Sequence, residues 1–247
     1  MHPRTRRARN YHRVVTVRRE LGECTSGQLS GAAPTVVVPL GSTEQHGPHL
    51  PLDTDTRIAV AVAGRVAADL GYLRAPAIAY GASGEHQGFP GTVSIGSAAL
   101  TAVLLEYGRS ACEWARRLVF VNGHGGNVEA LRRAVTLLRE EGRDVAWISC
   151  TAEGGDAHAG YTETSLLLHL SADAVRTEHM APGNTEALAD LMPRMRRDGV
   201  AAVSASGVLG DPTGASATAG EAILAGMVDD FSRRVRSWAP DGNGMLT

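Results

Sequence analysis

The chain has 247 residues, of which 43% are hydrophobic and 20% are charged. This composition is that of an ordinary globular protein and excludes disordered and collagen-like chains. The formal net charge of -2 provides no field that would attract the whole molecule to nucleic acid or to an anionic membrane, so we expect neither as a partner.

The N-terminal region is basic, with several arginines between residues 4 and 9, and no apolar signal-peptide segment follows it. No apolar run reaches the length of a membrane span. The three cysteines are widely spaced and form no CxxC pair, which favours a reducing compartment. We therefore predict a cytoplasmic protein in which residues 1–33 form a basic N-terminal arm and lead-in. Residues 1–12 are either a solvated arm or a contact to RNA or a membrane.

Short runs rich in β-branched residues alternate with longer amphipathic stretches from residue 34 onward. In chain order they predict a strand at 35–38, a helix at 56–70, a weaker strand at 75–79, a helix at 97–117 capped by Ser97, a strand at 118–121, a helix at 128–141, a strand at 145–148, and helices at 163–170, 184–198 and 217–237. Gly142 and Gly199 are placed to end two of these helices.

This order of elements is typical of an α/β fold built from βα units. We predict a single-domain, three-layer α/β/α architecture with a mostly parallel central sheet over residues 34–237, followed by a C-terminal tail at 238–247. In such a sheet the loops after the carboxyl ends of the strands meet at one edge, so residues distant in sequence converge there.

The first of these loops, residues 41–55, is the richest in potential ligands. Glu44 and His46 lie two residues apart and point to the same side of an extended segment, and Asp55 follows within reach. Imidazole and carboxylate oxygen form a common ligand set for zinc, manganese and iron(II). The alternative is that these residues only stabilise a polar turn.

Two further glycine-rich loops carry histidine and acidic residues. His124 lies in the run NGHGGN at 122–127, which is either a ligand loop or a plain turn and matches no nucleotide-binding pattern. His158 and Glu163 lie in the run at 154–165, although Glu163 alone could be a first-turn acid that complements a helix dipole. Together, the three loops predict a composite metal site.

The runs GSTEQHGPHLPLDTDT, YGASGEHQGFPGT, VNGHGGN and DAHAGYTETS together resemble the creatininase family of metal-dependent amidohydrolases, and the resemblance covers roughly residues 34–237. Within the family, the chain is similar to the branch encoded with mycofactocin biosynthesis, whose peptidases remove a C-terminal Val-Tyr piece from a modified precursor peptide. The resemblance implies a metal-dependent hydrolase of amide or peptide bonds.

The resemblance also implies the metal ligands. Family ligands fall on four positions of this chain, with the third as the carboxylate that bridges both ions: Glu44, His46, Asp55 and His124. Creatininase has a further Glu ligand two residues after the second-loop His, where this chain has Gly126. Glu163 is the expected replacement.

The implied chemistry is hydrolysis by water that two divalent metal ions activate, with zinc, iron(II) and manganese as the candidates. His158 is the candidate for proton transfer to the leaving amine, with Glu163 beside it, and the alternative for His158 is a metal ligand. We expect His49, Glu85 and His86 in the substrate pocket, where Glu85 either holds a peptide amine or is solvated.

The expected substrate is the modified precursor peptide. The alternatives are a small cyclic amide or a formamide, or a metal- or nucleotide-binding module without catalysis. Creatininase has an acidic residue just before its third-loop His, where this chain has Ala157, which argues against creatinine itself. Related family members assemble as closed rings or higher oligomers, so we also expect a homo-oligomer.

Overall fold

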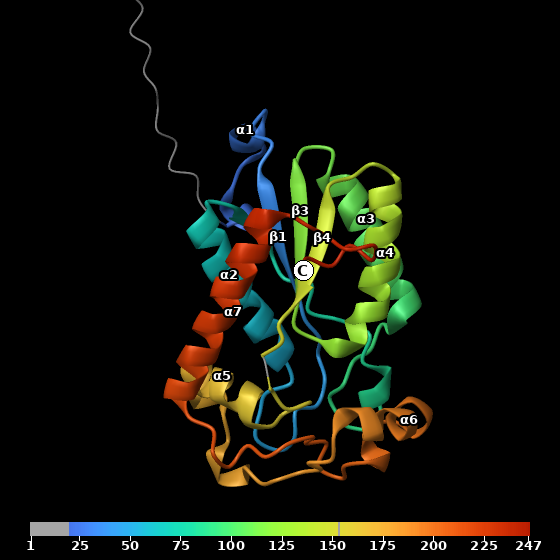
Figure 1. Ribbon diagram of the computed structural model, residues 1–247, viewed down its shortest axis with the longest axis vertical. Helices are drawn as coiled ribbons and strands as arrows, with labels where there is room; N and C mark the ends of the chain where they lie inside the picture. The colour runs from blue at the N-terminus through green and yellow to red at the C-terminus, as the bar shows by residue number, and fades with distance from the viewer. Residues whose placement is uncertain (1–19, 153) are drawn as a thin grey trace, which may run out of the picture.

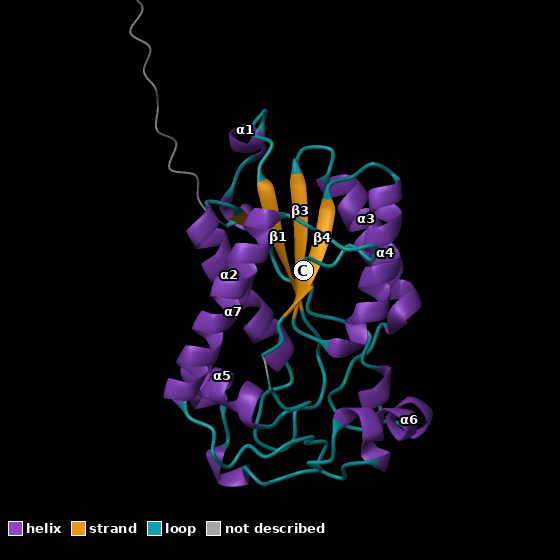
Figure 2. Ribbon diagram, in the orientation of Figure 1, coloured by secondary structure: helices purple, strands orange, loops and turns teal. Residues whose placement is uncertain are grey.

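The computed structural model describes residues 20–152 and 154–247, so the basic arm predicted at residues 1–12 lies outside the described residues. Its centre is a parallel sheet with the strand order β2-β1-β3-β4. The strands are β1 (Thr35–Leu40), β2 (Leu73–Arg74), β3 (Arg117–Asn122) and β4 (Val145–Ser149). Helices lie on both faces of this sheet (Figure 1 and Figure 2). The single-domain, three-layer α/β/α architecture predicted from the sequence is therefore confirmed.

Two groups of helices form the outer layers. One face of the sheet is covered by α2 (Thr54–Leu70), α5 (Tyr161–Ser171) and α7 (Ala217–Ser237), which contact one another. The other face is covered by α3 (Gly96–Ala111) and α4 (Val128–Glu140), which also contact each other. None of the helices in the described part of the chain is long and apolar enough to cross a lipid bilayer.

Shorter helices lie between these elements. They are η1 (Leu21–Glu23), α1 (Ser26–Leu29), η2 (Gly84–His86), η3 (Gly125–Asn127), η4 (Ala172–Ala174), η5 (Thr177–His179), α6 (Leu188–Asp198) and η6 (Val200–Ala202). The described part of the predicted lead-in packs on the domain, since Leu21, Cys24 and Leu29 lie against its buried core.

Side chains of the strands alternate between the two outer layers. Val37 and Val119 are buried with side chains of α2, α5 and α7, whereas Val38 and Phe120 are buried with side chains of α3 and α4. Because both faces of the parallel sheet are covered, the strands carry continuous apolar runs rather than alternating polar residues.

The strand predicted at 75–79 is wrong, because β2 ends at Arg74. Pro76 has no backbone N–H with which to continue the ladder. The chain nevertheless follows β1 past this point, since Ala75 N donates to Val37 O and Ile78 N donates to Pro39 O, each at 2.9 Å.

The helix predicted at 97–117 also differs from the structure. It begins at Gly96 and ends at Ala111, so Ser97 lies inside the helix and is not its cap. Ser94 Oγ instead accepts a hydrogen bond from Gly96 N at 3.3 Å. The helix ends early because the chain must enter the sheet, and Arg116 N already donates to Pro34 O at 3.0 Å.

Residues 238–247, predicted as a tail, return from α7 to β4. Leu246 N donates to Trp147 O at 2.9 Å, and Trp147 N donates to Gly244 O at 3.0 Å. The Leu246 side chain is fully buried. We predict that Leu246→Ala lowers the free energy of unfolding by about 2–4 kcal/mol, because it opens a cavity in the core. Urea unfolding measures this change, and Leu137→Ala, at an exposed position of α4, should cost far less.

Candidate metal centre

Three loops meet at the carboxyl edge of the sheet. The last residues of β1 and β3, Leu40 and Asn122, are partners in the sheet register, and Asn122 is also paired with Ser149 of β4. Asn127 links its own loop to two other segments. Its Nδ2 donates to Gly41 O in the first loop, and its Oδ1 accepts from Ala82 N, each at 2.9 Å. The histidines and acids of these loops therefore converge at one end of the molecule.

Asp55 lies between two imidazoles. Its Oδ1 is 3.0 Å from His46 Nε2, and its Oδ2 is 3.3 Å from His124 Nδ1. Ser42 Oγ donates to Oδ2 at 2.6 Å and orients the carboxylate. Because Asp55 is in the first turn of α2, the helix fixes its backbone. Each oxygen of this buried carboxylate thus faces a different histidine, His46 or His124.

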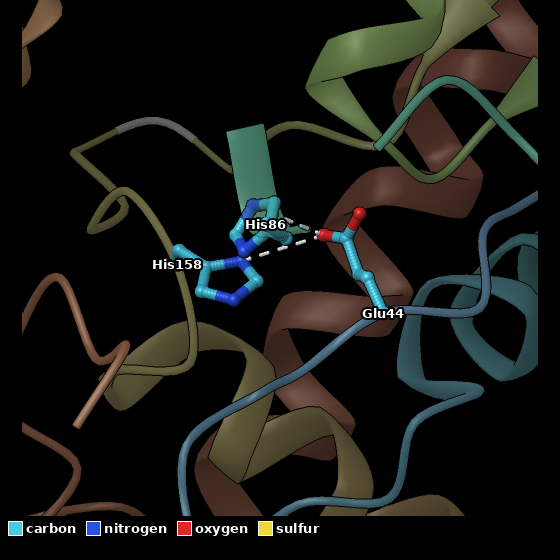
Figure 3. A group of neighbouring side chains, drawn as sticks. All are labelled: Glu44, His86 and His158. Carbon is cyan, nitrogen blue, oxygen red and sulfur yellow. Dashed lines mark ion pairs between the residues drawn. The ribbon is translucent and has the colours of Figure 1, made fainter. Parts of the chain in front are cut away.

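Glu44 is fully buried, and neither of its carboxylate oxygens accepts a well-aligned hydrogen bond from the described residues. Its Oε2 lies 3.2 Å from His124 Nε2. On the other side, Oε1 lies 3.5 Å from His86 Nε2 and 3.9 Å from His158 Nδ1, and both rings point toward it (Figure 3). A buried carboxylate without hydrogen bonds is costly unless a cation neutralises it, so this arrangement fits a bound metal ion.

Glu163, in the first turn of α5, is a further acidic residue of the cluster. Its Oε2 accepts a hydrogen bond from Ala159 N at 2.6 Å and lies 3.9 Å from His46 Nε2. Donor atoms within 4.8 Å of one another form three groups that could hold a metal ion: Glu44, His46 and Asp55; Glu44, His86 and His158; and His46, His158 and Glu163. These imidazole and carboxylate donors suit zinc, iron(II) and manganese.

The charged groups of the cluster stabilise one another. Burial alone would raise the pKa of Glu44, but the nearby His124 outweighs it and the pKa is lowered to about 2. Burial likewise opposes ionisation of Asp55, yet His46 and His124 hold its pKa well below the usual value. Burial would lower the pKa of His46, but Asp55 raises it to about 10. Both carboxylates are therefore ionised at neutral pH and available to a cation.

Other groups of the cluster are shifted toward their neutral forms. Burial, reinforced by the charge of His46, lowers the pKa of His158 to about 3. Burial also lowers the pKa of His86 to about 4. The pKa of Glu163 is raised to about 7 by burial, although His46 opposes this shift. The cluster thus combines ionised carboxylates with neutral imidazoles, as catalytic sites often do.

Gln45 is a site residue that the sequence analysis does not predict, although it lies in the loop singled out there. Its Nε2 lies 2.8 Å from His86 Nδ1 and 3.0 Å from His158 Nε2, and it donates to Gly207 O at 3.2 Å. Its Oε1 accepts from Gly47 N at 2.8 Å. Gln45 therefore orients two of the rings that face Glu44, since its side-chain amide contacts His86 and its backbone O lies 2.8 Å from His158 Nε2. This role depends on spatial neighbours and has no signal in the sequence.

A cavity of about 1480 Å³ opens onto the cluster. Asp55 and Glu163 line it at the cluster, together with Glu85 and His86 of the predicted substrate pocket. His49, also predicted there, is fully buried and does not line the cavity, and its Nε2 lies 2.9 Å from Thr164 Oγ1. Burial lowers the pKa of His49 to about 4, so the ring is neutral.

Comparison with known proteins decides the family. The family described as "Creatininase: Creatinine amidohydrolase" matches residues 23–235. The chain belongs to the creatininase family. The resemblance predicted from the four sequence runs is thus confirmed, and the match begins at residue 23, before the predicted boundary at residue 34.

Relatives within the creatininase family are similar over nearly their whole length. The chain is 64% identical to a "Mycofactocin precursor peptide peptidase" of Mycobacterium tuberculosis (strain ATCC 25618 / H37Rv), over 96% of this chain and 99% of that protein. It is 62% identical to a protein of the same name from Mycolicibacterium smegmatis (strain ATCC 700084 / mc(2)155), over 96% and 98%. A solved mutant creatininase of "Zn-Zn type" has a TM-score of 0.73 at 28% identity and covers 88% of this chain and 97% of its own.

Gly126, where creatininase itself carries a Glu, has no room for a side chain. A Cβ at this position would lie 2.2 Å from Ala82 O, 2.4 Å from His124 Nε2 and 2.7 Å from Glu85 Oε1. Glu85 Oε1 is also 3.6 Å from His124 Nε2. Two carboxylates from elsewhere in the chain, Glu85 and Glu163, therefore border the cluster of this family member.

Proposed function

We propose that this chain is a metal-dependent peptidase that cleaves a mycofactocin-type precursor peptide and releases its C-terminal Val-Tyr piece. The chain is a member of a hydrolase family, and relatives above 60% identity carry the peptidase name. The observation that carries the proposal is the buried carboxylate of Glu44, which accepts no well-aligned hydrogen bond from the residues that the structure describes and lies among imidazoles.

Two metal positions fit the donor atoms. One ion would be held by Glu44 and His124 and the other by His46 and Glu163, and Asp55 would contribute to both positions. Glu44 Oε2 lies 3.2 Å from His124 Nε2, and His46 Nε2 lies 3.0 Å from Asp55 Oδ1 and 3.9 Å from Glu163 Oε2, which supports this division. The structural similarity to the creatininase of "Zn-Zn type" supports a centre of two ions as well. Zinc, iron(II) and manganese all accept such ligands.

The mechanism follows from what the side chains can hold and move. When bound, divalent cations at this centre lower the pKa of water and polarise the scissile carbonyl. His158 presents its Nδ1 to the cluster, while its Nε2 lies 2.8 Å from Gln45 O and donates to that carbonyl. The free Nδ1 lone pair can take a proton from water and pass it to the leaving amine. Glu163 Oε2 lies 3.9 Å from His46 Nε2 and would serve as a ligand beside it.

The size of the cavity favours a peptide over a small cyclic amide. Pockets for small molecules usually measure about 300–1,000 Å³. The cavity here, at about 1480 Å³, exceeds that range. Glu85 lines the cavity beside the cluster, where its carboxylate can accept hydrogen bonds from peptide N–H groups.

Substrate tests separate the candidates. The metal-loaded protein is incubated with a precursor peptide ending in Val-Tyr, with creatinine and with a formamide, and the products are identified by mass spectrometry. We expect cleavage of the peptide alone. Release of no C-terminal piece from the peptide, with turnover of creatinine or the formamide, would replace the peptidase by the small-amide hydrolase.

A further inference from the structure

The helix α6 carries an apolar stripe that faces the cavity. Leu188, Met192 and Met195 are spaced by four and three residues, so they lie on one side of the helix. All of them line the cavity that also reaches Asp55 and Glu163. An apolar stripe at this spacing normally packs against the protein core.

Among the described residues, Leu188, Met192 and Met195 are not part of either buried core cluster, although Met192 and Met195 are half-buried. Leu191 is the buried residue of α6, whereas Leu188 is 43% exposed. The helix is attached mainly through η6 and η2, and Arg194 Nη2 donates to Ala202 O at 2.6 Å. Helix α6 is therefore held by one set of contacts and presents a separate apolar surface to the cavity.

The same helix is coupled to the metal centre through η2. At its carboxyl end, Gly199 packs so closely that a Cβ there would lie 3.0 Å from Glu85 O. Glu85 and His86 of η2 are the residues that approach His124 and Glu44, respectively. In Figure 1, α6 lies beyond the carboxyl ends of the strands, at the same end of the molecule as these loops. The cavity therefore has an apolar wall formed by α6 and a charged wall formed by the cluster of histidines and acids.

We propose that the stripe formed by Leu188, Met192 and Met195 is a specificity pocket that receives a bulky apolar side chain of the peptide, next to the scissile amide. The inference rests on the proposed peptidase function and names which part of the substrate this chain selects. Methionine suits such a pocket, because its flexible thioether adapts to irregular apolar shapes. Burial of the substrate side chain against the stripe removes apolar surface of both partners from water.

The test is a double-mutant cycle between protein and peptide. The holoenzyme, Met192→Ala and Leu188→Ala are compared on a precursor peptide ending in Val-Tyr and on peptides with Ala at either of these two positions. We expect each variant to lose about 10-fold in kcat/KM on the apolar peptide, mainly through KM, and less than about 3-fold on the Ala peptide that lacks the matching side chain. Leu137→Ala, an exposed apolar residue outside the cavity, should change neither.

The outcomes distinguish the two proposals. Equal losses on all peptides, or no loss in either variant, would overturn the specificity pocket while the wild-type cleavage still supports the peptidase. Failure of the wild-type holoenzyme to cleave any of the peptides would overturn the peptidase and the pocket with it. Thermal melting of each variant shows whether a loss reflects unfolding instead of a lost contact.

Discussion

Replacement of Asp55 by Ala or Asn is expected to remove bound metal and to lower kcat/KM by about 10³-fold or more. The reason is the position of the carboxylate, since its Oδ1 faces His46 and its Oδ2 faces His124. Loss of one side chain therefore removes a donor from both proposed metal positions. Metal content per chain, measured by elemental analysis, and peptide cleavage should fall together.

Asp53 provides the matched control. It lies two residues earlier in the same loop, its side chain is 46% exposed, and its ion pair with Arg57 is at the surface. Surface ion pairs of this kind contribute little to stability, so Asp53→Ala should keep both metal and activity. The Asn variant of Asp55 keeps the size of the side chain and guards against a packing defect. Full metal content and turnover in Asp55→Asn would end the proposal of a bridging carboxylate.

The parts of the fold that the sequence predicts correctly are those with strong local patterns. The apolar runs of β1, β3 and β4 are buried on both faces and stand out for that reason. The short strand β2 is misplaced in the prediction because Ala75 to Ala79 resembles a strand, while Pro76 interrupts its hydrogen bonding. Whether such a run joins the ladder depends on its partner strand, which the local pattern does not contain.

In the site, too, local patterns predict some features, whereas others depend on residues that are distant in sequence. The spacing of Glu44 and His46 in one glycine-rich loop indicates a metal centre, and the structure brings them together with Asp55 and His124. The contacts of Gln45 and the exclusion of a side chain at Gly126 could not be predicted, because both depend on loops that are distant in sequence. Likewise, His49 lies in the same loop as Glu44 and His46, but only its contact with Thr164 shows that it is buried.

His158→Ala is the second variant with a large expected effect. We predict that it retains metal but lowers kcat by about 10²–10⁴-fold, the usual contribution of a general acid or base. The prediction follows from the proposed division of the ligands, which does not use His158, although its Nδ1 is 3.9 Å from Glu44 Oε1. The other proposed ligands remain in place without it. Elemental analysis and single-turnover cleavage of the peptide measure the two quantities separately.

His169→Ala is the control for this variant. His169 lies near the end of α5, and its ring contacts Arg65 at 3.2 Å, away from the metal centre. The His169→Ala variant should keep full activity. This result would show that loss of a histidine from this region does not by itself stop turnover. His158→Gln tests the geometry, because the amide can still donate to Gln45 O but cannot carry a proton to the leaving amine. If His158→Ala and His158→Gln both lose metal along with activity, His158 is a ligand of the centre, and the group that protonates the leaving amine must be sought at Glu163.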